Sequence, residues 1–414
     1  MHCLYAQSSR AQSLLELIKM ENQQERLPWK FHKEMKKEIL AWLPVECLCK
    51  YVRVCKEWNA LFSSSKFITN HWVMAPPNDK PLLVMCHEGP PGLSMAYSFF
   101  TKAWETKISF FSFLYEKYQC NNAALNGSAA GLLLVSIVDP NRDIQADTVV
   151  TVFNPLTLAL LELPPLSDAD IVCLGITGGD EGTYKVVMVV ESMRWDRAQR
   201  VQIYDSSLKS WRIAGYLPDN LRAVNREWNK GVVFCHDFFY CRADEENSPR
   251  PGIMGFNLKN RSFTFLALPH MEVGNGIMLD SLFKCGLRVL VSRCIWDAAK
   301  ELQSIIIWEC EKLEMNSSCD SLGLKEITRM PPLLLQEFKR RHFVTWIFEV
   351  EGVGDWVCIK QGMSTTLCVY NLNENSWSWL PPCPVNEDKA LWPPTPGIPP
   401  TLVFSFEPRL DMKV

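Results

Sequence analysis

The segment VQIYDSSLKSW, residues 201–211, decides the fold, because its pattern returns as LCVYNLNENSW at residues 367–377. In the first copy, apolar and polar residues alternate up to Tyr204, which is followed by Asp205. A short polar stretch comes next, and a second aromatic residue, Trp211, stands seven positions after the first. Alternation with period two is typical of a β-strand, and a polar stretch between two such runs predicts a hairpin turn.

Further copies of this pair of residues occur along the chain: Tyr97 with Trp104, Phe153 with Leu160, Phe256 with Phe263, and Trp308 with Met315. The first members, at 97, 153, 204, 256, 308 and 370, are separated by 56, 51, 52, 52 and 62 residues. A period near 50 is the kelch spacing, in which each repeat is one four-stranded blade of a β-propeller. Six markers predict six blades. We expect residues 401–406 to pair near residues 82–85 and so close the ring.

Two other signals follow the same period. A Leu-Pro pair or its equivalent follows most markers, at Leu163-Pro164-Pro165, Leu217-Pro218, Leu268-Pro269, Met330-Pro331-Pro332 and Leu380-Pro381-Pro382. A glycine precedes several markers by 22 to 25 residues, at Gly131, Gly182, Gly231 and Gly286. Glycine permits tight turns, and proline ends an outer strand without a ladder partner. An all-β sandwich is the alternative to the propeller.

Residues 31–68 have a different character and read as helices, because apolar residues recur there every three to five positions. Pro44 should end the first helix at Leu43, since proline restricts the residue before it. A second helix should run to about Phe62, and the serines at 63–65 then form a turn. So small a unit needs another surface to cover its apolar face.

The segments ILAWLPVECL (39–48) and VRVCKEWNAL (52–61) resemble an F-box. The family pattern is I-L-x-x-L-P, then a leucine, then V-C-K-x-W and a final leucine, and every element is present. The resemblance implies binding to a Skp-type adaptor, which joins F-box proteins to a cullin and a RING subunit. The adaptor-binding residues it implies are Phe31, Ile39, Leu40, Leu43, Pro44, Leu48, Val52 and Trp58. An ordinary helical hairpin is the alternative.

The start of the F-box differs from the family pattern. F-boxes usually open with Leu-Pro eight residues before the position of Ile39, where this chain has Phe31-His32, and a Leu-Pro pair stands earlier, at 27–28. Either the first helix is longer by about one turn, or Phe31 replaces the usual leucine. The difference bears on the strength of adaptor binding.

Residues 77–410 resemble the propeller of plant F-box/kelch-repeat proteins through VFNPLT (152–157), GTYKVV (182–187), IYDS (203–206) and FEPRLD (406–411). The fold class we predict is therefore mixed: a small all-α F-box at 27–73, after a flexible extension at 1–26, then an all-β kelch-type propeller. The resemblance implies the substrate-recognition subunit of a Skp-cullin-F-box (SCF) ubiquitin ligase, without catalysis of its own. The alternative is a kelch scaffold that does not engage a cullin.

Composition and charge limit the classes of partner and the cellular location that we expect for this chain. The net charge is −3 and the pI near 6.2, whereas nucleic-acid binding usually leaves a basic footprint. We find neither a secretory signal nor an apolar run long enough to span a membrane. The sixteen cysteines form no Cys-x-x-Cys pair, so we expect reduced cysteines and a cytoplasmic or nuclear location. The run at 339–341, Lys-Arg-Arg, reads as a solvated loop rather than a nuclear address.

No catalytic, cofactor or metal site is predicted. The seven histidines show no metal-ligand spacing, and no nucleophile elbow or phosphate-binding glycine loop occurs. Cys235 and His236 are adjacent, and on a strand they should point to opposite faces. A copper oxidase of kelch type remains the enzymatic alternative. Substrate-binding residues stay unknown, but three loops are candidates: Glu191–Gln199, with Arg194 and Trp195 as anchors, Ala243–Gly252 and Leu313–Lys325.

Overall fold

The computed structural model describes residues 81–87, 93–99, 101–109, 111–119, 123–138, 148–166, 169–179, 182–193, 197–224, 232–246, 248–269, 278–299, 301–312, 322–341, 348–361, 364–384, 401–409, 412 and 414, together with residues 40, 61, 64 and 67. The chain divides into two compact units, Met1–Lys80 with Glu407–Lys413, and Pro81–Phe406 with Val414. None of the helices in these ranges is long and apolar enough to cross a membrane.

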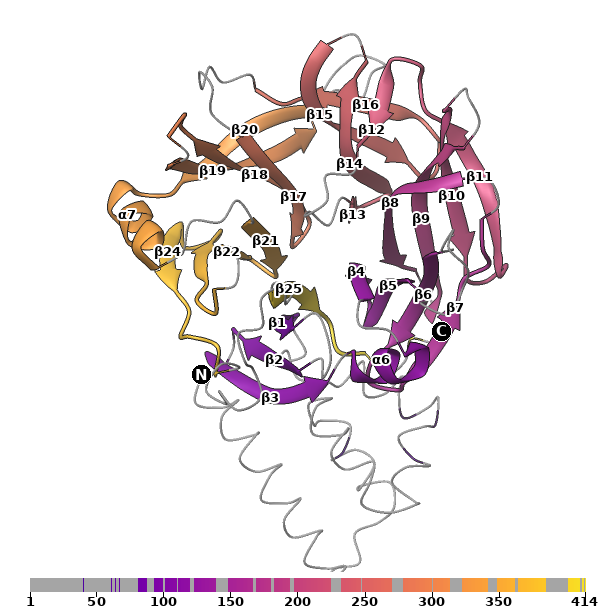
Figure 1. Ribbon diagram of the computed structural model, residues 1–414, viewed down its shortest axis with the longest axis horizontal. Coiled ribbons are helices and arrows are strands. Elements are labelled where there is room, and N and C mark those ends of the chain that lie inside the picture. Colours follow the sequence, from indigo (N-terminus) through magenta and orange to yellow (C-terminus); the bar gives the residue numbers. More distant parts are fainter. Residues whose placement is uncertain are drawn as a thin grey trace, which may run out of the picture. The chain divides into compact units, whose positions relative to one another are not determined.

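The second unit is a β-propeller in which the described strands form six antiparallel sheets around a ring (Figure 1). From the inner to the outer strand, blade 1 consists of β25 (Thr401–Phe406), β1 (Leu82–His87), β2 (Leu93–Ser98) and β3 (Ala103–Ser109), and blade 2 consists of β4 (Ala123–Ala129), β5 (Leu132–Val138), β6 (Thr148–Asn154) and β7 (Ala159–Glu162). In the same order, blade 3 consists of β8 (Ala169–Gly178), β9 (Tyr184–Ser192), β10 (Gln199–Asp205) and β11 (Ser210–Tyr216), and blade 4 consists of β12 (Leu221–Ala223) and β13 (Val232–Cys235), which both pair with β14 (Phe238–Glu245), then β15 (Ser248–Asn257) and β16 (Phe263–Ala267). Blade 5 consists of β17 (Met278–Cys285), β18 (Arg288–Trp296), β19 (Leu302–Lys312) and β20 (Leu322–Arg329), and blade 6 consists of β21 (Phe348–Val353), β22 (Trp356–Gln361), β23 (Cys368–Asn371) and β24 (Ser376–Trp379). The prediction of six blades is confirmed.

The ring closes through the C-terminal strand, as predicted. Strand β25 pairs antiparallel with β1, with Leu82 opposite Phe406 and His87 opposite Thr401. Blade 1 is therefore built from both ends of the propeller sequence. Closing a sheet ring in this way removes an open edge that could pair with another chain.

The repeat that defined the blades is a cross-strand pair. Tyr204 lies opposite Trp211 across the β10–β11 hairpin, and their rings meet edge to face with centroids 5.4 Å apart. The other pairs found in this arrangement are Tyr97 with Trp104, Phe153 with Leu160, Phe256 with Phe263 and Tyr370 with Trp377. The pairing of Trp308 with Met315 is wrong, because Trp308 lies opposite Glu326. Met315 itself lies outside the described residues.

The turns of these outer hairpins share a side-chain hydrogen bond that recurs in several blades. In blade 3, the Asp205 carboxylate accepts hydrogen bonds from the Ser207 amide (3.0 Å) and hydroxyl (2.5 Å). Partial burial alone would raise the pKa of Asp205, but these bonds and nearby cations outweigh it and lower the pKa. Four positions later, Lys209 has a positive φ of 50°. Asn154, Asn257 and Asn371 make the same turn cap, and Ser98 accepts instead from the amide three positions on, that of Thr101. Each is followed four positions later by a residue with positive φ: Leu158, Arg261, Asn375 and Lys102.

The Leu-Pro pairs join neighbouring blades. In blade 2, Leu163 is buried and its amide donates to the Val150 carbonyl (2.9 Å). The next carbonyl, that of Pro164, accepts a hydrogen bond from the indole nitrogen of Trp211 in blade 3 (2.9 Å). Trp104 makes the same contact with Pro381 of blade 6 (2.8 Å). The motif therefore ends one blade and positions the outer strand of the next.

Glycines act at turns and at one close approach. Gly131, Gly182 and Gly286 have positive φ, which agrees with the turn role predicted for them, and Gly231 lies outside the described residues. At Gly352 in β21, an added Cβ would lie 1.9 Å from the carbonyl oxygen of Lys284 in β17. Only a residue without a side chain allows these inner strands to approach so closely.

Carboxylates of blade 6 hold the closing strand. The Glu349 side chain accepts a hydrogen bond from the Val403 amide of β25 (2.8 Å), and the Glu351 side chain accepts one from Ser405 (3.2 Å). Glu349 also lies 3.0 Å from the ammonium nitrogen of Lys360, which is fully buried. On the other side, the Ser128 hydroxyl of blade 2 donates to the Ser405 carbonyl. Side chains of two neighbouring blades thus complete the hydrogen bonding of β25.

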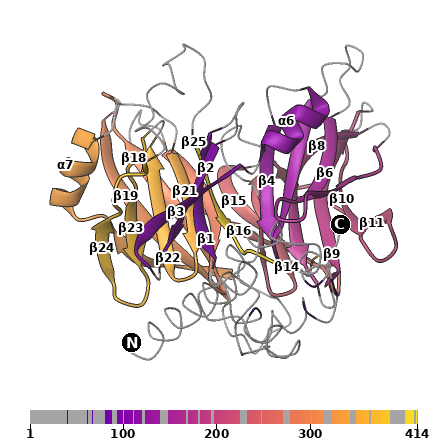
Figure 2. The same ribbon diagram turned by 90° about the horizontal axis from the view of Figure 1, so that it is seen from below.

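Two helices were not predicted. Helix α6 (Ser112–Tyr118) connects blades 1 and 2 and buries Leu114, Tyr115 and Tyr118 in the core between them. Helix α7 (Pro332–Arg341) connects blades 5 and 6 and buries Phe338. Residues 339–341 therefore form the last turn of a helix, and their assignment to a loop is wrong. Figure 2 shows α6 at the upper edge of the ring and α7 at its left side.

Candidate protein-interaction surfaces

Most of the predicted adaptor-binding residues lie outside the described residues: Phe31, Ile39, Leu43, Pro44, Leu48, Val52 and Trp58. Leu40 is helical and 1% exposed. Leu61 is also helical, and Ser64, in the serine turn, donates its hydroxyl to the Leu61 carbonyl (2.8 Å). The adaptor-binding role of the eight residues stays a prediction.

The propeller has two unlike rims. In an antiparallel blade, the turn between the first and second strands and the turn between the third and fourth lie at one end. We call this end the short-turn rim; it holds turns such as 130–131 and 206–209. The other end, the long-loop rim, holds the connections between second and third strands and those between blades, including α6 and α7. Residues 81 and 406, where β1 begins and β25 ends, both lie at the short-turn rim.

The three candidate loops do not share one rim. Glu191–Gln199 and Ala243–Gly252 connect second strands to third strands, so both lie at the long-loop rim. Leu313–Lys325 connects β19 to β20 and belongs to the short-turn rim. Arg194 and Trp195 lie outside the described residues, and so do residues 313–321. The first two loops therefore belong to the same rim, the long-loop rim.

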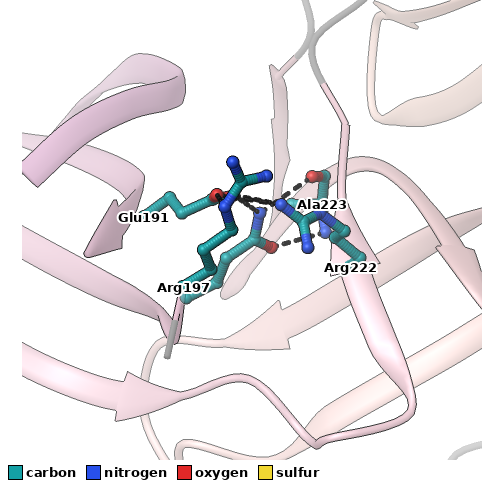
Figure 3. Close-up of polar contacts among 5 residues, drawn as sticks. Glu191, Arg197, Arg222 and Ala223 are labelled. Carbon is teal, nitrogen blue, oxygen red and sulfur yellow. Dashed lines mark hydrogen bonds and ion pairs between the residues drawn. The ribbon is translucent and has the colours of Figure 1, made fainter. Parts of the chain in front are cut away.

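A polar network fixes the first of these loops to blade 4 (Figure 3). Both oxygens of the Glu191 carboxylate lie 2.8 Å from one guanidinium nitrogen of Arg222 in β12. Gln199 donates to Glu191 (3.0 Å) and to the Ala223 carbonyl (3.2 Å), and its own oxygen accepts from the Ala223 amide (2.8 Å). Because Gln199 is buried, this junction holds the ends of the loop in place.

The outer part of the same junction remains open to solvent. The Arg197 side chain is 70% exposed and its nearest approach to Glu191 is 3.9 Å, beyond hydrogen-bond distance. Met193 is 65% exposed. Asp170 lies directly opposite Glu191 on the neighbouring strand. The arrangement suits contacts with a protein partner, with a mixed polar and apolar surface on a fixed base.

Two of the three cations in the last turn of α7 form ion pairs within the fold. Arg341 forms an ion pair with Glu337 (2.5 Å) and lies 4.4 Å from the centre of the Trp379 ring. Lys339 forms an ion pair with Glu301 (3.1 Å). These contacts hold the last turn of α7 against blades 5 and 6, while Leu333 in its first turn is 81% exposed.

Cys235 and His236 meet, contrary to the prediction that they point to opposite faces. Their sulfur and Nδ1 atoms are 3.2 Å apart, because His236 has left the strand and has a positive φ of 53°. The thiol also contacts the Leu287 carbonyl of blade 5 (3.0 Å), and Cys235 is buried. The pair therefore supports the contact between blades 4 and 5.

Nine of the ten described cysteines are buried. Burial raises the pKa of Cys285 to about 12, so this thiol is protonated at neutral pH. Among the described residues, no group of three His, Cys, Asp or Glu side chains could hold a metal ion. The described cysteines act as small apolar core residues.

Comparison with known proteins gives the family. The sequence family described as "F-box associated beta propeller domain" matches residues 94–378. The chain is similar to F-box only protein 6 of Arabidopsis thaliana, with 23% identity over 379 residues, covering 90% of this chain and 73% of that protein. It is also similar to an F-box/LRR-repeat/kelch-repeat protein of Arabidopsis thaliana (24% identity; 70% of this chain, 72% of that protein).

A third relative extends over nearly the whole chain. This F-box/kelch-repeat protein of Arabidopsis thaliana is 22% identical over 403 residues, which cover 92% of this chain and 89% of that protein. The prediction of a plant-type F-box/kelch-repeat protein is confirmed. With a six-bladed ring and a family match over more than half of its length, this chain belongs to the family of proteins with an F-box associated β-propeller domain.

Proposed function

We propose that this chain is the substrate-recognition subunit of an SCF-type ubiquitin ligase. The observation that carries the proposal is the combination of an F-box sequence at 39–61 with an F-box associated propeller in one chain. In this role the F-box binds a Skp-type adaptor, and through it a cullin and a RING subunit. The chain itself makes and breaks no bond.

The propeller supplies the substrate-binding part of this function. Residue 81, through which the F-box segment is joined to the propeller, lies at the short-turn rim. The long-loop rim carries the exposed Met193 and Arg197 on a base fixed by Glu191 and Gln199. We therefore assign the substrate to this rim. Holding a substrate near the ubiquitin carrier raises its effective concentration there, which is how such a subunit accelerates transfer.

Co-expression with a Skp-type adaptor tests the proposal. We expect the two proteins to purify together, and the variant Leu43→Asp with Pro44→Ala to lose the adaptor. A matched control is Leu333→Asp, which alters an exposed leucine of α7 and should leave adaptor binding unchanged. Failure of the wild-type chain to retain the adaptor, or binding that survives the double substitution, would contradict the proposal.

A kelch scaffold without a cullin is the second candidate. Phe31-His32, which stands where F-boxes usually have Leu-Pro, favours it. A scaffold would bind partner proteins in pull-downs that contain neither adaptor nor cullin. For either function we propose a cytoplasmic or nuclear location, which fluorescence microscopy of the tagged chain would test.

A further inference from the structure

Strand β11, the outer strand of blade 3, exposes apolar side chains. In the part of the chain that the structure describes, five other large apolar side chains are exposed, and they lie in turns, at a strand end or in α7: Leu158, Met193, Leu208, Leu287 and Leu333. The exposed ones within strands are both in β11: Ile213 is 48% exposed and Tyr216 is 60% exposed. A single exposed apolar residue needs no explanation, but two on one outer strand form a patch.

A bulge brings both side chains to one face of the blade. Ile213 lies opposite Gln202 and Tyr216 lies opposite Arg200, and the register shifts by one residue between these pairs. Their partners are two positions apart on β10, and residues two apart on a strand point to the same face. Trp211, opposite Tyr204, belongs to this face as well. Three large side chains thus follow one another along β11.

The outer strand of the neighbouring blade is shorter than β11. The indole nitrogen of Trp211 donates to Pro164 of blade 2, so the face is turned toward that blade. Strand β7 has four residues, whereas β11 has seven. The last residue of β7, Glu162, lies opposite the residue two positions before the marker Phe153. Ile213 likewise lies opposite the residue two positions before the marker Tyr204, so Glu162 and Ile213 occupy equivalent positions in their blades. Tyr216 lies beyond the end of β7.

The outer edge of β11 is also open for hydrogen bonding. Among the described strands, β11 ends the sheet of blade 3 and pairs only with β10. Proteins usually protect such edges with charged side chains. The outer strand of blade 5 follows this rule, because Lys325, Glu326 and Arg329 form ion pairs there. Strand β11 has one charged residue, Arg212, and the outer strands of blades 4 and 6 have none.

We propose that β11 binds an extended segment of a partner protein, which adds to blade 3 as a further strand. Main-chain hydrogen bonds to the open edge would hold the segment, and apolar side chains at alternate positions would contact Ile213 and Tyr216. The inference rests on the proposed function only in taking this partner to be a substrate. Strand addition itself requires neither the F-box nor an adaptor.

Selection from a library of random displayed peptides on the full-length chain tests the proposal. We expect enriched peptides to carry aliphatic or aromatic residues at alternate positions. Affinity of a synthesised enriched peptide, measured by fluorescence polarisation, should fall by about tenfold or more in Ile213→Asp and in Tyr216→Asp. The matched control Leu208→Asp alters a residue of the same blade that is 64% exposed in the turn at the opposite rim, and it should leave the affinity unchanged.

Several results would overturn the proposal. These are the absence of an alternating apolar pattern among the enriched peptides, or equal affinity for the wild type and both β11 variants. A peptide that binds as well after methylation of its alternate backbone amides would also exclude strand addition. If an aspartate variant lowers the melting temperature, Ile213→Thr and Tyr216→Ala take its place. Because the selection needs no adaptor, its failure is separate from a failure of adaptor binding.

Discussion

Replacement of Glu349 by leucine should loosen the closing strand of the ring. Glu349 accepts the Val403 amide of β25 through one oxygen and lies 3.0 Å from the Lys360 nitrogen through the other. Lys360 is fully buried, and the Glu349 side chain is 14% exposed. Glu349→Leu therefore leaves a buried cation and removes the acceptor of one strand amide.

The magnitude follows from these two losses. Removing one partner of a buried ion pair costs about 3–5 kcal/mol, and losing one strand hydrogen bond costs about 1 kcal/mol. The two effects share one side chain and overlap, so we expect a loss of about 4 kcal/mol. At roughly 2 °C per kcal/mol, the melting temperature should fall by about 8 °C. The double variant Glu349→Leu with Lys360→Met should recover most of this loss, because an apolar pair can replace a buried ion pair at little cost.

Thermal melting and hydrogen exchange would measure the effect. In Glu349→Leu, the amides of residues 401–406 should exchange faster than those of the outer strands, because β25 opens first. The control is Glu326→Ala, which removes an exposed ion pair of β20 and should change stability by less than about 1 kcal/mol. The reasoning would be refuted if Glu349→Leu and Glu326→Ala melted at the same temperature and the double variant with Lys360→Met did not raise the melting temperature above that of Glu349→Leu.

Three further predictions concern the blades. Gly352→Ala should destabilise the chain by more than about 2 kcal/mol, because the added Cβ would meet the Lys284 carbonyl. Gly354→Ala has open space around it and should cost about 1 kcal/mol, because Gly354 has a positive φ. Thermal melting of the two variants measures the difference. Trp211→Phe removes a hydrogen bond to the preceding blade and should cost about 1 kcal/mol in the same assay. The pKa of Asp205 is lowered in the folded state, so its carboxylate stabilises the fold above the usual pKa of about 3.9, and this stabilisation is lost as pH falls through the lowered value. The difference in unfolding free energy between the wild type and Asp205→Ala should therefore shrink in acid.

The blades could be predicted because their key contacts are local. Tyr204 and Trp211 meet across a hairpin whose turn has four residues, so spacing alone identifies the pair. The seven-residue spacing gave the wrong partner for Trp308, because its true partner, Glu326, stands eighteen residues away across a longer connection. A fixed spacing cannot identify a pair when the connecting loop varies in length.

Helix α7 was missed although the sequence contains a signal for it. Pro332 stands at the first helical position, where proline is favoured, and the helix ends in a basic turn. Reading Met330-Pro331-Pro332 only as a strand end concealed this start. The rim network was beyond reach for another reason: Glu191 and Arg222 are 31 residues apart and meet only because two blades lie side by side. Such contacts depend on tertiary packing rather than on local pattern.

The pairing of β25 with β1 has a consequence for synthesis of the chain. Leu82 and its partner Phe406 are 324 residues apart, the difference of their positions. At about 5–20 residues per second on the ribosome, β1 is made roughly 16–65 s before its inner neighbour exists. During that time the first blade lacks its inner strand, so the nascent protein presents an unpaired strand edge. Its exposure to chaperones and to misassembly should therefore last until residues 401–406 have been made.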